Sequence, residues 1–156
     1  MIFKFQKEHR WLSNFAPVQI VLDGFEYPSV EHAYISAKSD EAVWKEFCTS
    51  KDIEPKWVKK MSGLIKINPD WELEKLHVMK ACLIQKYHTE PYRTKLLEKG
   101  DQYIQEGNNW GDKFWGVCLE TNTGENILGK LIMKIRETLS ENDNLSFPVE
   151  IPTDLE

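Results

Sequence analysis

The hydrophobic and polar positions of the first thirty residues follow the spacing of short strands. Ile2 to Phe5 form one apolar run, and residues 18–22 and 25–27 form two more, separated by Asp23-Gly24. An Asp-Gly pair between two such runs is typical of a tight hairpin turn. The pattern therefore predicts a short first strand followed by a β-hairpin.

From residue 29 onward the apolar spacing becomes that of helices. Ser29 is a suitable N-cap for a helix that places Val30, Ala33, Tyr34 and Ala37 on one face. Further helices are predicted after an Asp40 cap, at 55–61, from Asn68-Pro69 to Tyr87, from Thr89-Glu90-Pro91 to Gly100, and at 126–139. Short strands are expected at 103–106 and 114–119. The predicted class is α+β, a helix-rich single domain with a small sheet.

Charge is concentrated at the C-terminus. The formal net charge is −5, and residues 141–156 hold five acidic residues and no Lys or Arg, so residues 1–140 are near neutral. A near-neutral body offers no long basic surface for duplex DNA. We expect residues 1–140 to form the domain and 141–156 to form an acidic, flexible tail.

The remaining composition narrows the setting. Cys48, Cys82 and Cys118 are far apart and form no C-x-x-C pair, so buried free thiols are predicted rather than disulfides or a zinc site. The four histidines show no metal-ligand spacing, and neither a metal nor a cofactor is expected. No apolar run approaches the ~18–20 residues of a membrane span, and the first residues lack a signal-peptide pattern. We expect a soluble, cytoplasmic protein without a membrane partner.

Three segments hold more polar and aromatic residues than packing requires: W-L-S-N-F at 11–15, S-V-E-H-A-Y at 29–34 with Lys38, and E-G-N-N-W-G-D-K-F-W-G at 106–116. Glu31 would sit in a first helical turn, where the helix dipole favours its ionised form. In the third segment tryptophan could stack on a base, and Asp112 or Glu106 could act as acid or base. Each segment also has a purely structural interpretation: a turn with core aromatics, a dipole-complementing Glu, and a hairpin with packed tryptophans.

The start of the last helix allows two interpretations of the same kind. Free backbone N–H groups around Asn126 could bind a phosphate. Alternatively, Asn126 is a plain N-cap.

These segments, together with D-G-F-E-Y-P at 23–28 and G-E-N-I-L-G-K-L-I-M-K-I-R at 124–136, occur in an order and spacing that resemble the NADAR superfamily. Its enzyme members include the YbiA-like N-glycosidases of riboflavin-pathway intermediates. The resemblance covers about residues 9–139, is mainly a helical pattern over 40–100, and excludes the acidic tail.

The resemblance implies a NADAR/YbiA-like fold and an N-glycosidase that hydrolyses the bond between a base-like nitrogen and C1 of ribose. The implied partner is a small phosphorylated ribosyl or ADP-ribosyl ligand. Two alternatives stay open: a hydrolase that removes ADP-ribose from guanine in DNA, and a non-catalytic module that binds NAD or ADP-ribose. The oligomeric state is left open.

Carried over by position, the resemblance implies that Glu31, Asp112 and Trp115 line the catalytic centre. Either carboxylate would stabilise positive charge on the ribose and activate water. Phosphate would be bound by Lys38 or by the turn near Asn126. The implied ligand-binding residues are Ser13, Asn14, Phe15, His32, Lys38, Gly107, Asn109, Trp110 and Asn126.

Overall fold

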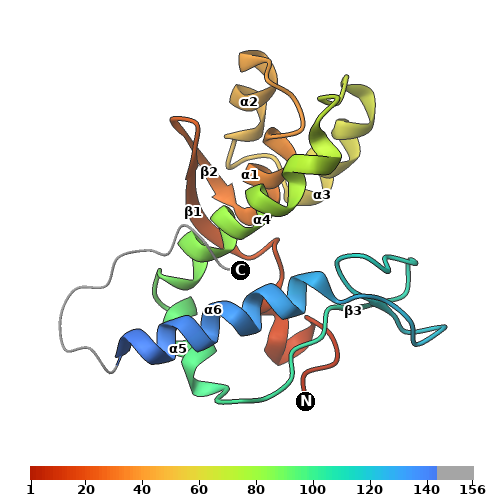
Figure 1. Cartoon of the computed structure of the whole chain (residues 1–156). Helices are drawn as coiled ribbons and strands as arrows, with labels where there is room; N and C mark the ends of the chain where they lie inside the picture. Colours follow the sequence, from red (N-terminus) through yellow and green to blue (C-terminus); the bar gives the residue numbers. More distant parts are fainter. Residues whose placement is uncertain (144–156) are drawn as a thin grey trace. The chain divides into compact units, whose positions relative to one another are not determined.

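The structure is a computed structural model that describes residues 1–143, and its chain divides into two compact units (Figure 1). The hairpin unit is Asn14–Lys86, and the terminal unit combines Met1–Ser13 with the chain from Tyr87 onward. Each unit has its own elements and is described by itself. Within residues 1–143 the elements are helices and two small two-stranded sheets, which confirms the predicted helix-rich α+β class.

The hairpin unit begins with the predicted hairpin. β1 (Pro17–Leu22) pairs antiparallel with β2 (Phe25–Ser29). Asp23 and Gly24 join the strands with φ angles of 52° and 83°. Two positive φ angles at the centre of a two-residue loop match the right-handed twist of a hairpin, and this explains why the Asp-Gly pair predicts it.

α1 (Val30–Ser36) follows the hairpin directly and is buried along its whole length. It packs against both strands, α2 and α3. The backbone N–H of His32 donates to Ser29 Oγ at 3.1 Å, so the predicted N-cap is confirmed. The apolar face expected from the sequence is only part of the buried surface, because neighbours cover α1 on every side.

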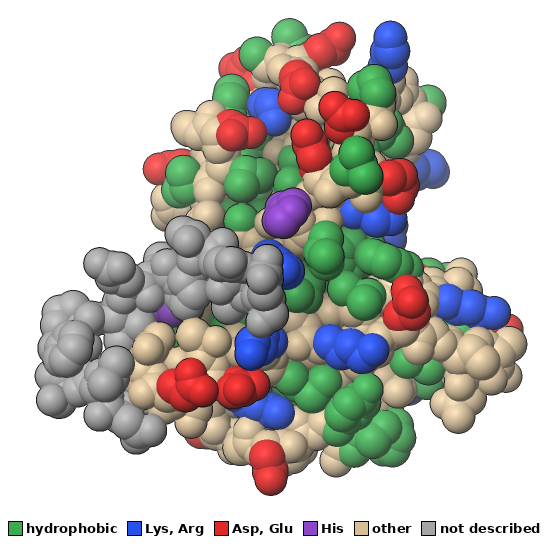
Figure 2. Space-filling view, in the orientation of Figure 1, with side chains coloured by type: hydrophobic (Ala, Val, Ile, Leu, Met, Phe, Trp, Pro, Cys, Tyr) green, Lys and Arg blue, Asp and Glu red, His purple; other side chains and the backbone are tan. Residues whose placement is uncertain are grey.

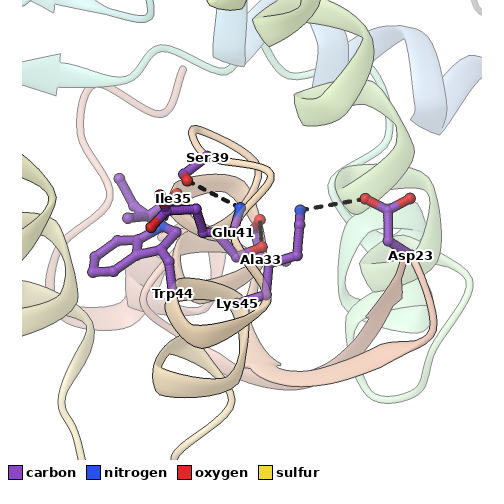
Figure 3. Close-up of polar contacts among 8 residues, drawn as sticks. Asp23, Ala33, Ile35, Ser39, Glu41, Trp44 and Lys45 are labelled. Carbon is purple, nitrogen blue, oxygen red and sulfur yellow. Dashed lines mark hydrogen bonds and ion pairs between the residues drawn. The ribbon is translucent and has the colours of Figure 1, made fainter. Parts of the chain in front are cut away.

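α2 (Ala42–Cys48) is anchored to its surroundings by side chains rather than by a cap (Figure 3). Trp44 Nε1 donates to the carbonyl of Ile35 at 3.1 Å, and Lys45 Nζ lies 3.5 Å from Asp23 Oδ2 at the hairpin turn. The predicted Asp40 cap is wrong: Glu41 is the N-cap residue and makes no side-chain cap bond. Its backbone N–H instead bonds Ser39 Oγ.

The hairpin unit continues with α3 (Pro55–Met61), the 3-10 turn η2 (Ser62–Leu64) and α4 (Trp71–Tyr87). α3 and the end of α4 match the predicted bounds, while α4 begins two residues after Pro69. The Gln85 side chain bonds both the N–H and the C=O of Val21, at 2.8 and 2.7 Å. It therefore satisfies an edge of β1 that a third strand would otherwise occupy.

The terminal unit holds η1 (Lys7–Leu12), α5 (Tyr92–Glu98), β3 (Gly107–Asn108), β4 (Val117–Cys118) and α6 (Ile127–Asp143). α5 packs against α6, and Gly100 ends the α5 segment with φ 60°, as predicted. α6 buries the residues expected from its spacing: Leu128, Leu131, Ile132, Ile135 and Leu139. It continues to Asp143, four residues beyond the predicted end at Leu139, and residues 144–156 of the predicted tail lie outside the described residues.

The strand predictions for this unit are largely wrong. In place of a first strand at 2–5, Ile2 makes an isolated parallel bridge with Ile104, and η1 follows at Lys7. β3 and β4 are two residues each and parallel, so the hairpin offered as the structural interpretation of residues 106–116 does not form. Side-chain hydrogen bonds, which periodicity does not report, hold this part of the chain together.

No helix within residues 1–143 is long and apolar enough to cross a membrane. The three cysteines are buried free thiols, as predicted, and burial raises the pKa of Cys48 and of Cys82 to about 12.

Candidate functional site

Glu31 lies in the first turn of α1, where burial dominates its chemistry. The residue is 8% exposed, and no described residue donates a hydrogen bond to its carboxylate. Burial raises the pKa of Glu31, and the charges of Lys59 and Lys38 oppose that rise. The expectation that the helix dipole keeps Glu31 ionised is therefore incomplete: two lysines favour the anion against the cost of burial.

These two lysines come from different elements of the hairpin unit. Lys38 follows α1, and its backbone carbonyl accepts the N–H of Asn68 at 2.7 Å, which fixes the chain there. Burial lowers the pKa of Lys38, and the Glu31 charge opposes that change. Lys59 projects from α3, and sequence reasoning missed it. Its only signal was its place in the basic stretch Lys59-Lys60 after a predicted helix start.

Asn14 supplies a further polar group beside Glu31. Its backbone carbonyl accepts the N–H of Glu31 at 3.0 Å, so the two residues are joined through the backbone. Its side chain contacts Met79, with Nδ2 3.6 Å from the thioether sulfur, and leaves Oδ1 buried without a described partner. We call Glu31, Lys38, Lys59 and Asn14 the Glu31 cluster.

Both ring nitrogens of His32 are engaged in hydrogen bonds within the protein, which argues against a role in catalytic proton transfer. Its Nδ1 lies 2.6 Å from Ser29 Oγ, and its Nε2 lies 2.7 Å from the carbonyl oxygen of Ile53. A carbonyl only accepts, so Nε2 carries the proton and Nδ1 accepts from Ser29. Burial lowers the pKa of His32, which favours this neutral ring. His32 thus ties the start of α1 to the segment before α3.

Phe15 and His32 also line a groove of about 720 Å³ within the hairpin unit, bounded by the hairpin and residues 49–55. Glu31 is not among its lining residues. The groove therefore brings together two of the predicted ligand-binding residues without the predicted catalytic carboxylate.

In the terminal unit, residues 106–116 form a loop that Asn108 closes; we call it the Asp112 loop. Asn108 is buried, its Oδ1 accepts the N–H of Asp112 at 3.0 Å, and its Nδ2 donates to the Asp112 carbonyl at 2.9 Å. Nδ2 also donates to Glu106 Oε2 at 3.1 Å. The sequence pointed to Asn109 instead, which is exposed.

Asp112 uses one carboxylate oxygen to shape the loop. Oδ1 accepts the backbone N–H groups of Phe114 at 3.1 Å and of Trp115 at 3.0 Å. No described residue donates a hydrogen bond to Oδ2. Trp115 packs edge-on against Phe114, with ring centroids 4.8 Å apart, whereas Trp110 is 62% exposed and open to a stacking partner.

Asn126 is committed to internal bonds. Its Oδ1 accepts the N–H of Glu106 at 3.0 Å, and its Nδ2 donates to the carbonyl of Ile104 at 2.9 Å. The N–H groups of Ile127 and Leu128 donate to the carbonyls of Phe114 and Trp115. The expectation that free N–H groups there bind phosphate is wrong for these two amides, because the Asp112 loop already occupies them.

Gly107 and Ser13, which were also predicted to bind ligand, have roles in local structure. Gly107 is needed for packing, because a Cβ there would overlap the carbonyl oxygen of Phe3. Ser13 ends η1, with its N–H bonded to the Arg10 carbonyl. Within residues 1–143, no group of three or more His, Cys, Asp or Glu could hold a metal ion.

Comparisons with known proteins match most of the chain to one family. The model of the NADAR domain family matches residues 2–140. An N-glycosidase of Nostoc punctiforme is 29% identical over 142 residues, which cover 88% of this chain and 90% of that protein. The N-glycosidase YbiA of Shigella flexneri is 30% identical over 133 residues, which cover 82% of this chain and 80% of that protein.

A riboflavin biosynthesis protein of Vibrio vulnificus is 28% identical over 148 residues, which cover 87% of this chain but 37% of that longer protein. The NMR structure of the E. coli protein YbiA superimposes with a TM-score of 0.78 at 25% identity, covering 96% of this chain and 88% of that one. A single family match includes both compact units, in line with the predicted single domain. The chain therefore belongs to the NADAR domain family.

Proposed function

We propose that this protein is an N-glycosidase that hydrolyses the bond between a base-like nitrogen and C1 of ribose in a small phosphorylated ribosyl substrate. The names of its relatives support a glycosidase role. The observation that supports this bond as the target is the state of the Glu31 carboxylate. Glu31 is buried and accepts no hydrogen bond from a described residue, and the charges of two lysines favour its ionised form.

The chemistry asks for such a group. When the C1–N bond breaks, its electron pair stays on the nitrogen, which takes up a proton, while positive charge develops on C1 and the ring oxygen. Water then adds to C1 and loses a proton. A fixed carboxylate stabilises that positive charge and accepts the proton of the water. Glu31 is suited to both tasks because internal hydrogen bonds do not consume its oxygens.

Lys38 and Lys59 have two roles in this proposal. They stabilise the ionised form of Glu31 against burial, and they offer ammonium groups for a substrate phosphate. The Oδ1 of Asn14, which has no partner among the described residues, can accept a hydrogen bond from a substrate hydroxyl or amino group. Asp112 and Trp110 are proposed to contact ligand through Oδ2 and through the exposed indole ring.

The first test is a product assay with a ribosylamino-pyrimidine phosphate. Release of ribose 5-phosphate by the wild type, lost in Glu31→Gln and kept in the exposed control Glu74→Gln, supports the proposal. If Glu31→Gln and Asp112→Asn both turn the substrate over at the wild-type rate, the assignment of the carboxylates is wrong. Tight binding of NAD or ADP-ribose without turnover of any substrate would favour a non-catalytic binding module.

A second candidate, removal of ADP-ribose from guanine in DNA, is favoured by the surface of α3. Residues 51–66 hold five lysines against Asp52 and Glu54, a net charge of +3 in a chain of −5. Trp57 is 49% exposed, with the ammonium groups of Lys56 and Lys60 5.4 and 5.3 Å from its ring centroid. An aromatic ring among cations suits an unstacked base and its phosphates.

The same assay separates the two candidates. Release of ADP-ribose from DNA carrying ADP-ribosylated guanine, at a rate that falls steeply with salt and falls in Trp57→Ala, would select the second. No release from that DNA, with turnover of the small substrate, would reject it.

A further inference from the structure

The terminal unit holds a second pocket, for which the proposed N-glycosidase activity gives no role. It has a volume of about 540 Å³ and lies along α6 beside the end of the α5 segment. Its charged lining is formed by Lys130, Lys134, Arg136, Asp101, Glu137 and Glu141. On the face drawn in Figure 2, Lys and Arg side chains lie over α6 with acidic side chains beside them.

Arg136 is the unusual member of this lining. The residue is 8% exposed, and its Nη1 is buried with no hydrogen-bond partner among the described residues. No carboxylate oxygen among the described residues lies within 4 Å of its guanidinium. Burying a charge without a partner is costly, and proteins usually pair such charges. Within residues 1–143 this buried cation has no counter-ion.

The acidic residues of the pocket do not take that role. Asp101, Glu137 and Glu141 are all exposed. Glu137 Oε2 lies 3.9 Å from Lys134 Nζ, so its nearest cation is a lysine rather than Arg136. Asp101 acts on Arg136 only at a distance, and burial is the larger influence, lowering the pKa of Arg136.

We propose that this pocket binds the phosphate group of a small phosphate ester, with Arg136 as its principal ligand and Lys134 and Lys130 at its mouth. A guanidinium offers paired N–H donors that match two phosphate oxygens, and it stays charged when buried. The pocket volume exceeds that of a bare phosphate and leaves room for the ester group. The exposed carboxylates repel a long polyanion, which selects a small ligand over nucleic acid.

The segment G-K-L-I-M-K-I-R at 129–136 gains an explanation from this site. Its apolar residues fill the core of the terminal unit, and that packing explains Leu131, Ile132 and Ile135. Packing does not explain a buried arginine in the same helix. A ligand of opposite charge does.

Binding of inorganic phosphate to the full-length protein tests the proposal directly. Titration followed by calorimetry, and by the shift in Tm, should show saturable binding that potassium chloride at equal ionic strength does not reproduce. Arg136→Met should weaken phosphate binding by about 10-fold or more, the equivalent of one charge-assisted hydrogen-bond pair. The exposed control Lys4→Met should bind as the wild type does.

One further variant and one further measurement keep the test decisive. Lys134→Met, at a half-buried position, should weaken binding by a few-fold while the protein stays folded. Arg136→Met without phosphate should have a Tm equal to or above that of the wild type, because it removes an unpaired buried charge. Absence of saturable phosphate binding by the wild type, or equal binding by wild type, Arg136→Met and Lys134→Met, would overturn the proposal.

Discussion

The two carboxylates predicted to do chemistry are held in opposite ways. Asp112 is half-buried, and its Oδ1 accepts two backbone N–H groups that define a turn. Glu31 is almost fully buried and accepts no hydrogen bond from the described residues. Hydrogen bonds to a carboxylate stabilise its charge and its position, so Asp112 is built into its loop while Glu31 is held by the helix beneath it.

The difference separates two kinds of contribution to a site. A carboxylate that satisfies amides adds to folding stability and gives up part of its reactivity. A carboxylate that is buried and unsatisfied costs stability and keeps its oxygens for a ligand or a water. A stability cost of this second kind is common where function, rather than packing, selects the residue.

The largest expected effect comes from Glu31→Gln, which sharpens the comparison because activity and stability should move in opposite directions. Activity should fall by about 10²–10⁴-fold, the usual contribution of a general base. Stability should rise at pH 7. The folded-state pKa of Glu31 is raised, so the wild type loses stability as pH climbs above the unfolded-state pKa, and the variant does not.

Thermal unfolding of both proteins at pH 4 and pH 7 measures this difference. The gap in Tm between Glu31→Gln and the wild type should be larger at pH 7 than at pH 4, where the carboxyl is largely protonated in both states. A variant that is less stable than the wild type at pH 7 would contradict the view of Glu31 as an unsatisfied charge.

Asp112 should show the reverse order of effects. Asp112→Ala removes the acceptor for two amides and should cost about 2 kcal/mol of unfolding free energy, following the typical value of such bonds. Asp112→Asn keeps an acceptor oxygen and should lose less than half of that. Its kcat/KM should fall by about 10-fold if Oδ2 contacts the substrate. Urea unfolding and the product assay measure the two quantities, and equal stability of Ala and Asn variants would show that the turn does not depend on Oδ1.

The same contrast explains how much the sequence could predict. The surroundings of Glu31 follow from local rules: an Asp-Gly turn, a Ser29 cap and helical spacing. The hairpin and the helices were therefore predictable, apart from the cap of α2 and helix ends that shifted by two to four residues. The resemblance carried by the order and spacing of the motifs was also enough to identify the family.

The Asp112 loop depends on contacts that no local rule describes. Asn108 and Asn126 bond backbone groups up to 22 residues away, and these bonds replace the strands that alternation predicted. The Lys59 charge acts on Glu31 only because α3 packs against α1, so its role depends on tertiary structure. The burial of Arg136 without a partner among the described residues likewise cannot be recognised in a helix whose apolar spacing is ordinary.

Ser29→Ala tests whether the surroundings of Glu31 place it as suggested. The hydroxyl caps α1 and bonds the His32 ring, so its loss should cost about 1–2 kcal/mol of unfolding free energy. The fall in kcat/KM, expressed as a free energy, should be smaller than the loss of unfolding free energy, because Glu31 itself is retained. Ser29→Thr keeps the hydroxyl and serves as the matched control. A loss of stability in the threonine variant as large as in the alanine variant would mean that packing, rather than the cap, matters there.

Lys59→Met should have the smallest effect. It tests whether the Lys59 charge helps to keep Glu31 ionised. The Lys59 charge lowers the pKa of Glu31, so its removal should raise that pKa further. If the ionised carboxylate is the active form, the acid limb of the kcat/KM profile should move to higher pH, with the plateau rate little changed. Lys66→Met removes an equal, exposed charge that has no such influence and should leave the profile in place. An acid limb that moves to lower pH, or by the same amount in both variants, would show that the ionisation of Glu31 does not govern it. Glu31 would then no longer be preferred to Asp112 as the catalytic carboxylate.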